Sequence, residues 1–214
     1  HGVVVAQQAV PDKGSEIPAL RDLLATMDLA GVVVTADALH CQRETADFIT
    51  DAGGHYVLTV KANQPGLRAA LKNLPWSDVP GHRSHDLHHG RTVTRTVKAV
   101  EAPAWIDWPG AAQVLQVRRT RTIKGRKHIE VVYAISSVPM TAAQPRQVAS
   151  WIQGHWGIEN ALHWVRDVVF DEDRHQLRVG AGPQVMATLR NTAISLLRLA
   201  GWSSIAAGLR HHAR

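Results

Sequence analysis

Short β-branched runs alternate with helical patterns through the first 74 residues, and this alternation restricts the fold more than any other feature. Three runs have the length and composition of strands: GVVVAQ (2–7), GVVVTAD (31–37) and HYVLTVK (55–61). Apolar residues at helical spacing lie between the first two runs, and residues 41–52 form a second helical pattern that ends at Gly53. Alternating units of this length predict an α/β fold, in which helices cover a sheet.

A β-rich insertion is predicted over residues 75–138. It starts with a loop dense in Pro, Gly and His and continues with three strand-like runs, RTVTRTVKAV, AQVLQVRRTRT and KHIEVVYAIS. Lys124 and Gly125 are the predicted hairpin turn between the last two runs. The chain returns to helical patterns from Thr141, and a further amphipathic helix is predicted from Pro183 to Leu199. We therefore expect three parts, 1–74, 75–138 and 139–214, with the insertion between two halves of one core.

Bulk properties predict an ordered protein of the cytoplasm that binds an anionic partner. A chain of 214 residues with 45% hydrophobic residues can bury a sizeable core, and no apolar run approaches a membrane span. The single Cys41 allows no intrachain disulfide, as is usual in a reducing compartment. The 24 Lys and Arg residues against 18 Asp and Glu leave a formal net charge of +6. This excess favours nucleic acid as the partner.

The stretch HWGIENALHWVRDVVFDED (155–173) combines acidic, basic and aromatic residues on a predicted helix. A helix advances ~100° per residue, so His155, Glu159 and Arg166 lie within about 60° of one another. Trp156 and Trp164 fit ordinary core packing. Taken alone, Glu159 is better explained as a solvated surface charge, because acids are rarely fully buried, and a catalytic role requires a second carboxylate elsewhere in the chain.

A zinc site in this stretch is excluded by distance. His155 and His163 are separated by ~12 Å of helix rise, whereas a Zn–N bond is ~2 Å long. Zinc-binding helices place two His residues four positions apart, as in H-E-x-x-H, and this stretch lacks that motif.

Asp37 is the candidate partner of Glu159. It follows the VVVT run, and α/β sheets bind ligands beyond the carboxyl ends of their strands. A helix N-cap is the alternative role for this residue. Two carboxylates, one after a strand and one on a helix, are typical of a site for divalent cations with oxygen ligands, which would suit phosphoryl transfer.

Three segments resemble the H-repeat-associated branch of bacterial insertion-sequence transposases: TADALHCQRETADFITDAGGHYVLTVKANQ (35–64), HGRTVTR (89–95) and the 155–173 stretch. The resemblance covers nearly the whole chain. It implies a ribonuclease-H-like fold, a mixed sheet flanked by helices, with a β-rich insertion. It also implies a DDE catalytic triad, of which Asp37 is the second acid and Glu159 the third, and a pair of Mg²⁺ or Mn²⁺ ions held by these acids.

The resemblance further implies a substrate and residue roles. Double-stranded DNA at transposon ends is expected to be cleaved and its 3′ hydroxyl joined to target DNA, with a homodimer bridging two ends. The family pattern places Tyr, Arg and Lys seven before, four before and seven after the glutamate, where this chain has Ile152, His155 and Arg166. Arg166 keeps the positive charge and is the expected phosphate contact. His155 is expected to contact DNA when protonated or to orient Glu159.

One departure from the family concerns the first aspartate, which belongs to a strand before residue 1. Nothing in HGVVVAQQAVPDKGSE replaces it, so the chain is expected to be truncated at its start and to lack the first strand or strands of the fold. We expect the polypeptide as printed to be inactive or nearly so. A DNA-binding remnant without catalysis is the alternative, and an upstream strand with an aspartate would distinguish the two.

Basic residues gather near the predicted hairpin. Six of the ten residues in RRTRTIKGRK are basic, and we expect them to contact DNA phosphates: Arg118, Arg119, Arg121, Lys124, Arg126 and Lys127. A solvated hairpin that protects an edge strand from aggregation is the alternative. Lys61 and Gln64, which follow the third strand, are further candidates for DNA contact, and an ordinary loop is the equal alternative.

Overall fold

The computed structural model describes residues 2–10, 13–88, 91–123 and 125–213, and it leaves out the side chains of Lys13, His88, Arg91, Ile123, Glu159 and Asn160. The chain divides into two compact units. One unit is Leu24–His155, and the other combines His1–Leu23 with Trp156–Arg214. Within the described part of the chain, no helix has the length and apolar character that crossing a bilayer requires.

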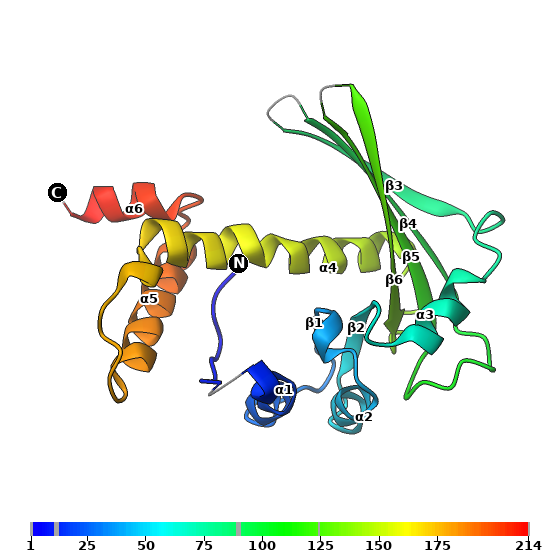
Figure 1. Cartoon of the computed structure of the whole chain (residues 1–214), viewed down its shortest axis with the longest axis horizontal. Helices are drawn as coiled ribbons and strands as arrows, with labels where there is room; N and C mark the ends of the chain where they lie inside the picture. The colour runs from blue at the N-terminus through cyan, green and yellow to red at the C-terminus, as the bar shows by residue number, and fades with distance from the viewer. Residues whose placement is uncertain (1, 11–12, 89–90, 124, 214) are drawn as a thin grey trace. The chain divides into compact units, whose positions relative to one another are not determined.

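The unit Leu24–His155 is built on a curled mixed sheet, as expected for an α/β fold (Figure 1). Its described strands follow the order β1-β2-β6-β5-β4-β3. Their bounds are β1 Val33–Ala36, β2 His55–Val60, β3 Gly81–His88, β4 Arg91–Glu101, β5 Gln113–Ile123 and β6 Arg126–Ser136. β1 and β2 are parallel, and the other neighbouring strands are antiparallel.

The β-rich segment continues the same sheet. β2 pairs with only the last residues of β6, from Tyr133 to Ser136, so β3 to β6 extend beyond the two short parallel strands (Figure 1). The prediction of a loop over residues 81–88 was wrong, because these residues form β3 and pair with β4 from end to end. Pairing satisfies their backbone groups, and it outweighs the low strand propensity of a segment rich in Gly, His and Asp.

Short helices complete this unit and bury its core. They are α2 (Arg43–Asp51), α3 (Pro65–Lys72) and the start of α4 (Pro145–Ile158), all close to the predicted positions. The largest fully buried apolar side chains of the unit are Ile49, Tyr56, Leu58, Leu71, Leu115 and Ile135. Ile49 comes from α2 and Leu71 from α3, so both helices anchor apolar faces in the core beside the strands.

The second unit is mainly helical. Its elements are η1 (Lys13–Ser15), α1 (Glu16–Leu24), the turns η3 (Glu159–His163), η4 (Val165–Val169) and η5 (Glu172–Arg174), then α5 (Gly182–Leu199) and α6 (Ile205–His212). A cluster of Val165, Ile194, Leu197 and Ile205 forms its buried core. α5 confirms the predicted amphipathic helix, whereas α6 was not predicted.

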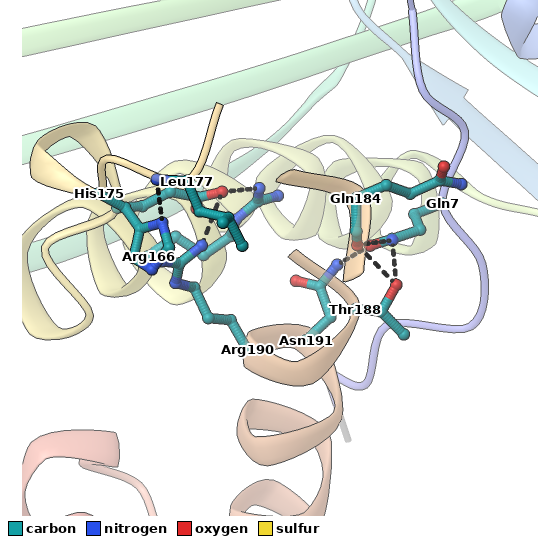
Figure 2. Close-up of polar contacts among 9 residues, drawn as sticks. Gln7, Arg166, His175, Leu177, Gln184, Thr188, Arg190 and Asn191 are labelled. Atoms are coloured by element: carbon teal, nitrogen blue, oxygen red, sulfur yellow. Dashed lines mark hydrogen bonds and ion pairs between the residues drawn. The ribbon is translucent and has the colours of Figure 1, made fainter. Parts of the chain in front are cut away.

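The prediction of a strand over residues 2–7 was wrong, because the described residues 2–10 belong to no sheet. Their polar groups bond to α5 instead: Val4 N donates to Ser195 Oγ at 3.0 Å, and Asn191 Nδ2 donates to Gln7 Oε1 at 2.6 Å (Figure 2). A β-branched run has strand propensity, but it forms a strand only where a neighbouring strand supplies hydrogen-bond partners.

Cys41 is expected to resist alkylation while the protein is folded. Its side chain is 0% exposed, and burial raises the pKa of the thiol to about 12. The thiolate is the reactive form, and each pKa unit changes its population tenfold, so iodoacetamide at pH 8 should label native protein roughly a hundredfold or more slowly than protein in urea. Mass spectrometry measures the two rates, and similar rates would contradict the burial of Cys41.

Candidate active site

Asp37 lies directly after β1, at the carboxyl end of the strand, where the sequence analysis expected a ligand. Its side chain is exposed, and its Oδ1 accepts a hydrogen bond from Leu39 N at 3.0 Å. This bond makes Asp37 the N-cap of a short 3-10 helix, Ala38–His40. The capping role that the sequence left open is therefore present. It uses one carboxylate oxygen and leaves the acid accessible from solvent.

His155 connects α4 to the strand that precedes Asp37. Its Nδ1 lies 3.3 Å from Thr35 Oγ1, and both residues belong to the unit Leu24–His155. Thr35 stands two positions before Asp37, and alternate residues of a strand point to the same side. The sequence analysis missed Thr35, although its place two positions before the acid was a usable signal.

Glu159 begins a stretch of π-helical geometry, where the sequence analysis expected a regular helix. The α-helical turns of α4 end at Ile158, and the π-helical turns η3 and η4 follow. The bond from Phe170 N to Val165 O, at 3.1 Å, has the i to i+5 spacing of such a turn. Short π-helical segments occur often at functional sites. The side chain of Glu159 lies outside the described residues.

Arg166 is held by an acid, which the sequence analysis did not foresee. Its Nε and Nη2 donate to the two carboxylate oxygens of Glu172, both at 2.5 Å (Figure 2). Arg190 Nη1 of α5 lies 3.5 Å from Glu172 Oε1, and the Arg190 side chain is only 7% exposed. The hydrogen bond from Arg166 lowers the pKa of Glu172 below its usual range. A phosphate that binds Arg166 would therefore share this guanidinium with Glu172.

Lys61 and Gln64 differ in accessibility. Lys61 follows β2 and is exposed. Gln64 precedes α3, and its Nε2 donates to Cys41 O at 2.9 Å and to Gln42 Oε1 at 3.2 Å. The amide of Gln64 thus holds the loop around Cys41 in place, whereas Lys61 presents its ammonium group to solvent.

The predicted hairpin between β5 and β6 is confirmed. Ile123 pairs with Arg126 across the two-residue turn, and Gly125 has a φ of +76°, a conformation that favours glycine. Lys124 lies outside the described residues. The strand register separates the other basic residues between two faces, with Arg118 and Lys127 on one face and Arg119, Arg121 and Arg126 on the other.

The described residues supply part of a donor set for a divalent cation. Asp37 fits, because an exposed carboxylate at a strand end is the oxygen ligand that Mg²⁺ and Mn²⁺ prefer. Among the described residues, no group of three or more His, Cys, Asp and Glu side chains is placed to hold a metal ion, and this includes His82 and His85 of β3. The described residues thus supply one expected ligand and not a complete site.

The family model for the transposase DDE domain matches residues 1–196. The chain belongs to this family of DDE transposases. The transposase chain is 32% identical to the putative protein YbfL of Escherichia coli strain K12 over 212 residues, which cover 92% of this chain and 55% of YbfL. The H repeat-associated putative transposase YhhI of the same strain shows the same identity and coverage. The transposase chain therefore spans about half the length of these relatives.

A solved structure of the piggyBac transposase synaptic complex with hairpin DNA aligns with 89% of the transposase chain and 34% of that chain. The TM-score is 0.39 at 14% sequence identity, which is too low to assign a shared fold.

Proposed function

We propose that this chain is the catalytic part of a DDE-type transposase with a ribonuclease-H-like core and an inserted β-rich segment. The enzyme cleaves double-stranded DNA at the ends of an insertion sequence and joins the freed 3′ hydroxyl to target DNA. It works as a homodimer that bridges two ends. The match of the transposase DDE domain over residues 1–196 supports this proposal.

The 3.3 Å contact between His155 and Thr35 is the structural observation that supports a role for the segment around Asp37 in this proposal. Along the chain, His155 stands four positions before Glu159, and Thr35 stands two positions before Asp37. In this proposal His155 orients the helix rather than reacting itself, and Thr35 holds the imidazole.

Asp37 and Glu159 would hold Mg²⁺ or Mn²⁺ through carboxylate oxygens. When bound, the ions supply Lewis-acid activation of water and of the 3′ hydroxyl, and they stabilise the departing oxygen. The chain's own residues position the DNA. Arg166 contacts a phosphate near the two acids, Lys61 contacts a more distant one, and Gln64 keeps the loop after Asp37 in place.

The polypeptide of these 214 residues is expected to bind transposon-end DNA but to nick it near the background rate. It carries two of the three acids that the resemblance implies, so the negative charge around the metal ions is incomplete. The measurement is nicking of a supercoiled plasmid that carries the element's ends, with Mg²⁺ or Mn²⁺ and with EDTA as the control. Robust turnover that EDTA stops would contradict the need for a third acid.

The alternative is a DNA-binding protein without catalysis. A longer polypeptide that adds a third acid separates the two proposals. Metal-dependent nicking by that polypeptide supports the transposase, whereas tight DNA binding without nicking supports the alternative.

A further inference from the structure

The strands β3 to β6 have two faces with different chemistry where they extend beyond β2. Neighbouring residues of a strand point to opposite faces, and directly paired residues share a face. We name the first face the threonine face; it carries Arg83, Thr92, Thr94, Thr96, Arg118, Thr120, Thr122 and Lys127. We name the second face the arginine–acid face; it carries Asp86, Arg95, Arg119, Arg121, Arg126 and Glu130.

Two cations of the arginine–acid face, Arg95 and Arg119, already have acidic partners. Arg95 Nη1 forms an ion pair with Asp86 Oδ2, and Arg119 Nε lies 3.6 Å from Glu130 Oε2. The two arginine side chains are only 20% and 25% exposed. Burial, followed by repulsion from Arg121, lowers the pKa of Arg119. These contacts hold the strands together and neutralise two of the four cations named on this face within the sheet.

The threonine face carries positive charge without acids. Among the described side chains of β3 to β6, each acid lies on the arginine–acid face, namely Asp86, Glu101 and Glu130. Beyond β2, the cations of the threonine face are Arg83, Arg118 and Lys127, and all three are exposed. Threonine hydroxyls fill the rows between them and can donate hydrogen bonds.

The register places these groups in regular rows. Arg83 pairs with Thr96, and Thr96 pairs with Arg118, so the two arginines lie two strand spacings apart, or ~10 Å. Lys127 pairs with Thr122, four residues along β5 from Arg118, or ~14 Å. Phosphates of one DNA strand rise ~3.4 Å per nucleotide along the duplex axis. The face is therefore long enough to meet several phosphates.

We propose that the threonine face is the surface that binds the phosphate backbone of duplex DNA, and that the arginine–acid face of the same hairpin does not contact DNA. This inference rests on the proposed function, in which DNA is the substrate. Exposed cations without acids complement a polyanion, and threonine hydroxyls are common phosphate donors. The exposed side chains of Leu87, Ile129 and Val131 on the same face pack against sugars between the phosphates.

Two double variants with equal charge change test the assignment. Arg118→Gln with Lys127→Gln alters the threonine face, and Arg121→Gln with Arg126→Gln alters the other face of the same hairpin. For each, the affinity for a duplex is measured by fluorescence anisotropy from low to moderate salt. Loss of a phosphate contact lowers the slope of log affinity against log salt by ~0.9, so the first variant should lose ~1.8 and the second less than ~0.5.

Two further measurements exclude general effects of charge or folding. Thr94→Val with Thr120→Val keeps the charge and strand propensity, so it should weaken binding without changing the salt slope. In the unaltered protein, bound DNA should protect Lys127 from acetylation by acetic anhydride, as measured by mass spectrometry.

The outcomes separate this inference from the proposed function. Equal slopes for the two charge variants, or a larger loss from the arginine–acid variant, would overturn the face assignment and leave DNA binding intact. DNA binding that neither variant changes would also overturn it, as expected if the face instead takes a protein partner. Failure of the unaltered protein to bind duplex DNA would overturn both.

Discussion

Replacing Asp37 with Asn is expected to slow metal-dependent nicking roughly a hundredfold to a thousandfold. This is the loss of rate that follows removal of one preorganised group that stabilises charge in a transition state. The rate is measured on a DNA-nicking polypeptide that contains these 214 residues. The substitution exchanges an anionic oxygen for a neutral amide and so weakens a divalent-cation ligand. Asn can still accept the hydrogen bond from Leu39 N, so the local turn is retained. DNA affinity should remain unchanged.

Asp28 provides a matched control for this variant. It is also exposed, and its Oδ1 accepts a hydrogen bond from Ala30 N at 3.0 Å, the same two-residue contact that Asp37 makes. Asp28→Asn should nick DNA at the unaltered rate. Titration of Mn²⁺ into the 214-residue chain gives a second readout, since Asp37→Asn should weaken Mn²⁺ binding and Asp28→Asn should not. A full nicking rate in Asp37→Asn would remove this residue from the catalytic site.

Replacing Glu172 with Gln is expected to lower the free energy of unfolding by about 3 kcal/mol. Glu172 is the acid that neutralises both Arg166 and Arg190, and its side chain is 23% exposed. Removing one partner from a largely buried ion pair leaves a desolvated charge without a partner. The folded state then loses more stability than it would if both charges were absent. Most of this loss of stability comes from Arg190, because its side chain is only 7% exposed. Urea unfolding followed by circular dichroism measures the change.

The same acid makes stability depend on pH in a defined direction. Because the folded-state pKa of Glu172 is lowered, its stabilising effect is present above the unfolded pKa of ~4.3 and is lost as pH falls through the folded value. The difference between wild type and Glu172→Gln should therefore be constant near pH 7 and shrink below about pH 4.

Asp171→Asn is the control for Glu172→Gln. Asp171 pairs with Arg174 at 3.7 Å, but both side chains are largely exposed. An exposed pair contributes about 0.5 kcal/mol, and Asn tolerates the left-handed backbone, with φ of +50°, at this position. A loss below about 1 kcal/mol for Glu172→Gln, similar to the control, would show that both arginines are solvated.

Local patterns predicted most of the elements. The VVVT run, the helix that stops before Gly53 and the Lys124–Gly125 turn all depend on neighbouring residues, through β-branching, backbone freedom and helical periodicity. The position of Asp37 after a strand followed from the same reasoning, and the structure confirms it. The family followed from linked motifs and is confirmed by the match over residues 1–196.

The secondary structure predicted from the sequence was wrong where hydrogen-bond partners far away in the chain determine it. Residues 81–88 became a strand because β4 is available to pair with them, and residues 2–7 did not because α5 side chains take their polar groups. Hydrogen-bond partners that lie far away in the chain are invisible to periodicity and propensity.

Charge and strand periodicity are properties of the residue order, so the sequence by itself determined the positive excess, the alternation along each strand and the acid after β1. Only the tertiary structure decided the pairing of each charge, because an ion pair requires two side chains to meet in space. Register alone shows that Arg119 faces Glu130 while Arg118 faces Val131, and the packing of α5 alone brings Arg190 to Glu172. Coulomb energy depends on distance and burial, which the fold sets.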